Sequence, residues 1–308
     1  MTYGIVVGLI DLNVNYLIKG NKRELRKPMS LAEENKKVLV IGLDGATPEL
    51  IMKWAKEGKL PTFARLIDNG VSGTLKSTIP PLTCPAWLSF LTGRNPGNLG
   101  VFDYCERKPE TYEIRYGVNF RSVNSKYLWD IISEKSKKVG IFNVPTTFPP
   151  REVNGFIVSG WPIPQNAIFT YPRNLQSKLD IYAGKMHVND RSIVEATWRW
   201  YSAEDGFLKG LYRSAEWEVK AAKYLITNYE WDLFVTVFTG LDPIQHFFWK
   251  HMDPNHPLHN SKEAEKYGNE ILELYQRMDE VTKELLEKID ENTTVIVMSD
   301  HGCGAFPV

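Results

Sequence analysis

The chain has 308 residues, of which 43% are hydrophobic and 24% are charged, a composition typical of a soluble globular protein. Its 37 basic and 37 acidic residues give a net charge of zero, which provides no electrostatic indication of binding to nucleic acid or to an anionic membrane. The 3 cysteines show no Cys-x-x-Cys spacing and indicate reduced thiols, so we expect a cytoplasmic protein without a disulfide framework.

Residues 1–36 are predicted to form an N-terminal extension or linker. The first residues are apolar, but Asp11, Asn13 and Asn15 interrupt the run, so we expect no membrane-spanning helix there. A basic region and a cleavage site of small residues, which mark a signal peptide, are not found in this stretch. We therefore expect a strand or a short helix at the start, followed by a polar linker.

From Lys37 onward, short apolar runs alternate with segments whose apolar residues recur at helical spacing. The apolar runs predict strands within residues 37–45, 72–80, 137–145, 155–160, 231–242 and 293–302. Helical spacing predicts helices within residues 49–70, 84–93, 125–136, 204–228 and 262–290. This alternation predicts an α/β fold: a doubly wound, mostly parallel central sheet with helices on both faces. The aromatic-rich residues 161–230 are expected to form a cap or an insertion.

Acidic and histidine side chains follow three of the predicted strands. Asp44 follows the first, Asp242 follows a later one with His246 four residues on, and Asp300 and His301 follow the last. Ligands of open α/β sheets bind outside the carboxyl ends of the strands, so we expect these five side chains to lie together. Three carboxylates in one place would repel one another without cations. The pattern therefore predicts divalent metal, and the mixed oxygen and nitrogen ligands suit zinc, manganese or iron rather than calcium.

Thr83 lies in the proline-rich segment STIPPLTCPAW, residues 77–87, directly before a predicted helix. A helix N-terminus offers free N–H groups and the positive end of the helix dipole, which favour a bound phosphate. A threonine hydroxyl in this position could coordinate a metal, lose its proton and attack phosphorus. The alternative role for Thr83 is a simple N-cap.

Four segments in this order resemble the type I phosphodiesterases and nucleotide pyrophosphatases of the alkaline phosphatase superfamily: GLDG, PPLTCPAWLSFLTGRNPGNLGVFDY, LDPIQHFFW and SDHG. The resemblance spans roughly residues 37–304 and implies an alkaline phosphatase-like catalytic domain over residues 37–308. It implies a small-molecule phosphate ester as substrate and two divalent ions, zinc first, with manganese or iron as alternatives. Thr83 would attack phosphorus in line and form a phosphothreonine, which water would then hydrolyse. The metal ligands that the resemblance implies are Asp44, Thr83, Asp300 and His301 for one ion, and Asp242 and His246 for the other.

The sequence departs from the family pattern in two places. The family supplies a third ligand to the second metal from a histidine downstream of SDHG, whereas this chain ends at Val308, so we expect a C-terminally incomplete domain. The asparagine that nucleotide pyrophosphatases often carry three residues after the nucleophile is replaced by Ala86. The alternative function is therefore a truncated, inactive or weakly active relative that only binds metal or a partner.

Three histidines and one cysteine are further functional candidates. His251, His256 and His259 lie in a predicted loop, and we expect them to be solvated or to cap helices. Cys84 raises the alternative of a sulfatase, whose nucleophile is a modified cysteine. The spacing disfavours it, because no arginine follows Cys84 until Arg94.

Overall fold

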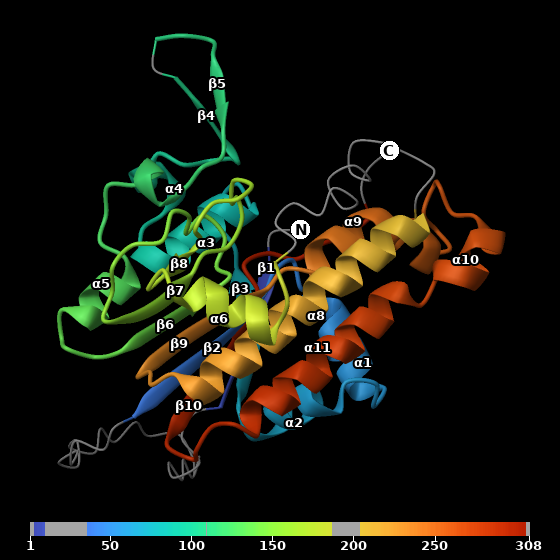
Figure 1. The fold of residues 1–308 in the computed structure, drawn as a ribbon. Helices are drawn as coiled ribbons and strands as arrows, with labels where there is room; N and C mark the ends of the chain where they lie inside the picture. Colours follow the sequence, from blue (N-terminus) through green and yellow to red (C-terminus); the bar gives the residue numbers. More distant parts are fainter. Residues whose placement is uncertain (1–2, 10–35, 109, 187–203, 306–308) are drawn as a thin grey trace, which may run out of the picture.

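The computed structural model describes residues 3–9, 36–108, 110–186 and 204–305 and shows one large sheet flanked by helices (Figure 1). Within these residues eight strands are joined in the order β3-β1-β10-β2-β9-β6-β7-β8. Their bounds are β1 Tyr3–Leu9, β2 Lys37–Leu43, β3 Val71–Lys76, β6 Val139–Phe142, β7 Gly155–Val158, β8 Thr170–Tyr171, β9 Leu233–Phe238 and β10 Thr293–Met298.

The centre of the sheet is parallel. Strands β10, β2, β9, β6 and β7 run in one direction, while β1 and β8 pair antiparallel with their neighbours. This arrangement confirms the predicted mostly parallel sheet. It also places the carboxyl ends of β10, β2 and β9 next to one another, at the edge where ligands of such sheets bind.

Helices cover both faces of the sheet, as predicted, and bury two separate cores (Figure 1). Strand β2 contributes to both, because successive side chains of a strand point to opposite faces: Leu39 and Ile41 enter the first core and Val40 the second. The first core is covered by α1 Pro48–Lys56, α2 Pro61–Asn69, α6 Leu175–Tyr182, α8 Glu204–Asn228, α9 Leu241–Met252 and α11 Glu270–Leu286. The second is covered by α3 Thr83–Thr92, α4 Pro96–Leu99 and α5 Leu128–Ser133.

Several local elements differ from the expectation. The helix predicted over residues 262–290 is two helices, α10 Ser261–Tyr267 and α11, because α10 ends at Gly268, a residue that commonly stops helices. Helix α9 ends at Met252, so it includes His251 at the start of the stretch predicted to be a loop, whereas His256 and His259 lie beyond the helix. A two-stranded hairpin projects from the body of the molecule (Figure 1) and consists of β4 Cys105–Arg107 and β5 Ile114–Tyr116.

The structure can be compared with only part of the predicted division of the chain into an extension, a catalytic domain and a cap. Strand β1 comes from the predicted N-terminal extension and lies in the sheet between β10 and β3, whereas the predicted linker at residues 10–35 lies outside the described residues. In the predicted cap, α8 packs on the sheet, and residues 187–203 lie outside the described residues. The boundaries at residues 1–36, 37–308 and 161–230 therefore stay predictions. Among the described helices, none combines the length and the apolar character that crossing a bilayer requires.

Candidate active site

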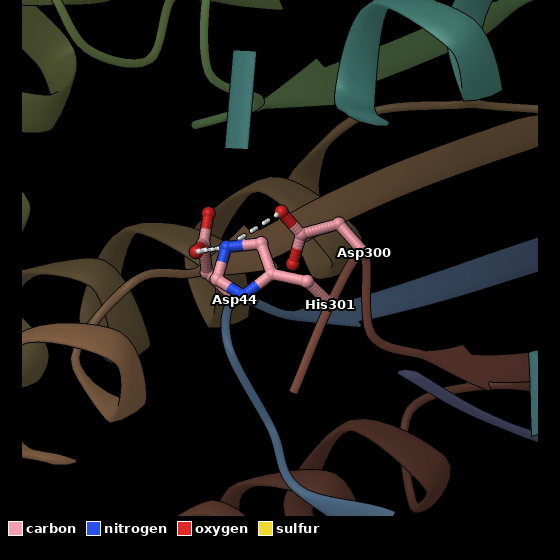
Figure 2. Close-up of side chains that lie close together, drawn as sticks. All are labelled: Asp44, Asp300 and His301. Carbon is pink, nitrogen blue, oxygen red and sulfur yellow. Dashed lines mark ion pairs between the residues drawn. The ribbon is translucent and has the colours of Figure 1, made fainter. Parts of the chain in front are cut away.

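Asp44, Asp300 and His301 converge at the carboxyl edge of the sheet (Figure 2). Strands β2 and β10 are parallel neighbours in which Met298 pairs with Gly42, so the two strands end side by side. Each strand is then followed closely by its acidic residue. One ligand atom from each of the three side chains lies within 4.8 Å of the others. The neighbouring parallel strands thus bring together residues from distant parts of the chain.

The hydroxyl of Thr83 lies against this group. Thr83 is the first residue of α3, and its Oγ1 lies 3.1 Å from Nε2 of His301 and 3.4 Å from Oδ1 of Asp44. Nε2 of His301 lies in turn 3.8 Å from Oδ1 of Asp44 and 3.4 Å from Oδ2 of Asp300. The structure therefore brings together all four residues that were predicted around the first metal.

The remaining polar atoms of these side chains are held by neighbouring groups. Trp87 Nε1 donates a hydrogen bond to Asp44 Oδ2 at 2.9 Å, and the backbone N–H of Gly45 donates to Asp300 Oδ1 at 3.2 Å. Nδ1 of His301 lies 3.1 Å from the carbonyl oxygen of Gly302. A carbonyl only accepts, so this contact favours a proton on Nδ1 and leaves a lone pair on Nε2, directed toward Thr83.

The electrostatics of this group call for a cation. Burial raises the pKa of Asp44 well above its usual value, and the Asp300 and Asp242 carboxylates raise it further. Burial likewise raises the pKa of Asp300, to which the charge of Asp242 also contributes. Within the described residues, Oδ2 of Asp300 is buried and accepts no hydrogen bond. Two buried carboxyls, one of them with an unsatisfied oxygen, and an imidazole lone pair form a donor set that fits a divalent ion.

Asp242 and His246 form a neighbouring pair on the first turns of α9. Oδ1 of Asp242 lies 3.1 Å from Nε2 of His246, four residues on. Asp242 packs against Gly45, where an added Cβ would lie 2.9 Å from the Asp242 Cα and where φ is +70°. The pair therefore lies beside the first group. Among the described residues, however, no third ligand atom completes a group around it.

A buried network joins the two loops and the helix α9 that carry these side chains. The hydroxyl of Thr47, after β2, donates to Oε1 of Gln245 on α9 at 2.9 Å and accepts from the backbone N–H of Cys303, after β10, also at 2.9 Å. Nε2 of Gln245 donates to the carbonyl oxygen of Gly45 at 2.8 Å. The hydroxyl of Tyr275 on α11 accepts from the backbone N–H of Thr47 at 2.8 Å. These contacts fix the loops relative to one another.

Sequence reasoning missed Tyr104. Its hydroxyl donates a hydrogen bond to Thr83 Oγ1 at 3.0 Å, and its ring packs edge-on against Trp161 with centroids 5.5 Å apart. The available signal was its position at the end of the family-like segment that begins before Thr83. Nothing in helical or strand periodicity indicates such a contact.

A second cluster of ligand-type side chains lies elsewhere in the molecule. Glu204, His251 and Glu263 come from α8, α9 and α10. His251 was expected to be solvated or to cap a helix; it is buried in the last turn of α9, and its Nε2 lies 3.1 Å from Oε1 of Glu204. The same oxygen accepts a hydrogen bond from Lys250 Nζ at 2.9 Å. A lysine already neutralises this carboxylate, so the cluster is explained as an ion-pair network joining three helices. His256 is buried as well, so the expectation of a solvated side chain is wrong for it.

Comparisons with known proteins agree with this architecture. The family model for type I phosphodiesterase / nucleotide pyrophosphatase matches residues 38–307, which confirms the resemblance. Phosphonoacetate hydrolase from Sinorhizobium meliloti 1021 in complex with phosphonoformate has a similar structure, with a TM-score of 0.56 and 18% identity over 87% of this chain and 56% of that chain. The same enzyme in complex with phosphonoacetate has a TM-score of 0.54, with the same identity of 18% and the same coverage of 87% and 56%.

A further solved structure is an inactive form of murine ectonucleotide pyrophosphatase / phosphodiesterase 5 in complex with AMP. It has a TM-score of 0.47 and 16% identity over 87% of this chain and 57% of that chain. No curated protein sequence matches the chain at a significant level. The chain spans a little over half the length of these three solved structures, and the phosphonoacetate hydrolase structures show that it shares their fold.

Proposed function

This chain belongs to the type I phosphodiesterase / nucleotide pyrophosphatase family, and we propose that it hydrolyses phosphate esters with Thr83 as the nucleophile. The bond cleaved would be a phosphodiester, or a phosphomonoester or pyrophosphate bond. The observation that carries this proposal is the position of Thr83 Oγ1, 3.1 Å from His301 Nε2 and 3.4 Å from Asp44 Oδ1. A hydroxyl held among metal-type ligands at the start of a helix is well placed to attack phosphorus.

Asp44, Asp300 and His301 would hold one divalent ion, and Asp242 and His246 would contribute to a second. Zinc is the first choice, because it accepts both carboxylate oxygen and imidazole nitrogen, and manganese and iron are the alternatives. When bound, such ions supply Lewis-acid chemistry: they lower the pKa of a coordinated hydroxyl and neutralise charge on the phosphate. The buried, unsatisfied Oδ2 of Asp300 supports an ion at the first position.

The reaction would proceed in two steps. Thr83, oriented by Asp44 and His301, would release its proton to solvent water and attack phosphorus, while the bond to the leaving group breaks on the opposite side and the leaving oxygen takes up a proton from water. The product of this step is a phosphothreonine and a free leaving group. Water then attacks phosphorus, and the Thr83 oxygen takes back a proton as it leaves. Helix α3 begins at Thr83, so the positive end of its dipole favours the anionic phosphoryl group in both steps.

The substrate class that we propose is a small phosphate ester. The family description names phosphodiesters and nucleotide pyrophosphates, and the similar hydrolase structures contain small phosphonates. Burial of Thr83, which is 7% exposed, favours a compact reacting group over a long polymer lying across a flat surface.

A second candidate function is a relative that binds metal or a partner without turnover. It is favoured by one observation: the described residues offer Asp242 and His246 but no third ligand for a second ion. Metal content separates the two candidates. About two ions per chain supports the two-metal hydrolase, and one ion or none supports the binding protein.

The test of the proposed function is the turnover of bis(p-nitrophenyl) phosphate with added zinc or manganese. Thr83→Ala should lower kcat by roughly a thousandfold or more, as removal of a nucleophile does. Thr83→Ser keeps a hydroxyl at the same position and is the matched control, which should retain far more activity. Unchanged metal-dependent turnover in Thr83→Ala would overturn the assignment of the nucleophile.

A further inference from the structure

The phenol of Tyr104 occupies a defined position at the proposed nucleophile. Its hydroxyl donates to Thr83 Oγ1 at 3.0 Å. The backbone of Tyr104 is anchored, because its carbonyl oxygen accepts from the N–H groups of Gly117 and Val118 at 3.1 and 3.2 Å. The ring is held edge-on by Trp161 at an interplanar angle of 72°. Both the backbone and the ring of Tyr104 are therefore fixed before any substrate binds.

Tyr104 differs in chemical character from the other side chains at Thr83. In the described part of the chain, three side chains lie within hydrogen-bond distance of Thr83 Oγ1: Asp44, His301 and Tyr104. Asp44 and His301 present a carboxylate oxygen and a lone pair, which suit a cation or the hydroxyl proton. Tyr104 is the member of the three that donates a hydrogen bond toward the reacting oxygen.

A donor is needed at this position. In-line attack places negative charge on the nonbridging oxygens of phosphorus, and preorganised donors stabilise that charge. The position three residues after Thr83 holds Ala86, which is buried and has no polar side-chain atom. Once phosphorus is bonded to Thr83 Oγ1, its nonbridging oxygens are only two bonds away from that atom. They therefore come within reach of the phenol that contacted the hydroxyl beforehand.

We propose that Tyr104 is a catalytic residue that donates its hydroxyl hydrogen bond to a nonbridging phosphoryl oxygen in the transition state. This inference rests on the proposed function of Thr83. The proton stays on the phenol throughout, so the bonds formed and broken are those of the two-step reaction described above. Trp161 contacts the Tyr104 ring edge-on.

The test compares Tyr104→Phe with the unmodified chain, because this change removes the hydroxyl and keeps the ring that packs on Trp161. We expect kcat for bis(p-nitrophenyl) phosphate to fall roughly 100-fold, the loss typical of one transition-state donor, with KM nearly unchanged. Calorimetry gives a readout that does not depend on turnover. Orthovanadate, which mimics the pentavalent state, should bind at least about tenfold more weakly, whereas inorganic phosphate should bind about equally well.

The matched control is Tyr127→Phe. Tyr127 is also a buried tyrosine, and its hydroxyl donates to the backbone oxygen of Phe120 at 3.1 Å rather than to a site residue. Equal losses in the two variants, or unchanged kcat and vanadate affinity in Tyr104→Phe, would overturn the role of Tyr104. In either case, inactivity of Thr83→Ala would leave the proposed function in place. If the unmodified chain neither hydrolyses the ester nor binds vanadate, the proposed function fails, and the role of Tyr104 fails with it.

Discussion

The indole Nε1 of Trp87 donates a hydrogen bond of 2.9 Å to Oδ2 of Asp44, one turn along the helix that begins at Thr83. Trp87 is fully buried, so little can change the direction of this bond. With Oδ2 held in this way, Oδ1 of Asp44 is left facing Thr83 and His301. Helix α3 thus orients a proposed metal ligand and carries the proposed nucleophile.

Replacing Trp87 by Phe should weaken binding of the first ion by roughly 10- to 100-fold, because the group that orients a ligand contributes to metal affinity. Calorimetric titration with Zn²⁺ would measure the change. Trp129→Phe is the matched control, since Trp129 is equally buried but, within the described residues, its Nε1 has no hydrogen-bond partner. A similar loss of affinity in both variants would show that core packing, not the bond to Asp44, is responsible.

Gly45→Ala should destabilise the fold more than Gly58→Ala. Both glycines have positive φ, +70° and +73°, so each alanine would pay a left-handed backbone cost of about 1–2 kcal/mol. At Gly58 an added Cβ meets no atom within 4 Å, whereas at Gly45 it would lie 2.9 Å from Asp242. This overpacking should add about 1–3 kcal/mol to the loss of unfolding free energy. Urea unfolding measures both losses, and equal values would contradict the close approach of Gly45 to Asp242 on α9.

Glu218 should make stability fall as the pH rises. This carboxyl on α8 accepts hydrogen bonds from Asn143 and Thr239, yet burial raises its pKa from 4.5 to about 7. Between pH 4.5 and about 7 the folded state therefore binds more protons than the unfolded state, and the unfolding free energy decreases through this window. From pH 5 to pH 8 the stability of the unmodified chain should fall by about 2–3 kcal/mol relative to Glu218→Gln.

Urea unfolding of both proteins at several pH values would test this expectation. Glu265→Gln, at an exposed position on α10, is the control and should follow the unmodified chain at every pH. A constant difference between Glu218→Gln and the unmodified chain from pH 5 to pH 8 would contradict it.

Metal titration should reveal two unequal sites. The first ion should bind tightly, because Asp44, Asp300 and His301 form a complete group of ligand atoms, and the second more weakly, because Asp242 and His246 are a pair. At a free metal concentration of 100 times Kd, the first ion should add about 2.7 kcal/mol to the unfolding free energy. Asp300→Asn should remove this stabilisation and Asp242→Asn should retain it. Loss of the tight site in both variants would indicate a single shared site instead.

The sequence alone predicts much of the sheet edge, because the carboxyl ends of parallel strands meet there. Each strand end can be read from its own stretch of sequence, and this was sufficient to select Asp44, Asp300 and His301. Tyr104 could not be selected in this way, because it lies in the loop between α4 and β4, and loops have no periodic sequence pattern. Trp87 was expected only as part of an apolar helix, since its bond to Asp44 depends on how α3 packs on β2.

In the fold, too, features that depend on local sequence could be predicted, and features that depend on tertiary packing could not. Continuous apolar runs identified β2, β9 and β10 correctly, because strands buried on both faces are apolar throughout. The position of β10 between β1 and β2 follows from tertiary pairing, which no local pattern encodes. The break of the long C-terminal helix at Gly268 was a readable stop signal that the amphipathic pattern on either side concealed.

The position of β10 also sets the order of events while the protein is being made. β10 is the last of the eight described strands in the chain, yet it lies inside the sheet, and Asp300 bonds to the backbone of Gly45, 255 positions earlier. At a synthesis rate of about 5–20 residues per second, roughly 10–50 s separate the emergence of these two residues from the ribosome. For that time the nascent chain holds Asp44 without Asp300 and His301, the two other members of its ligand group. An ion at the proposed site can therefore meet the full set of Asp44, Asp300 and His301 only after β10 and the residues that follow it have been synthesised.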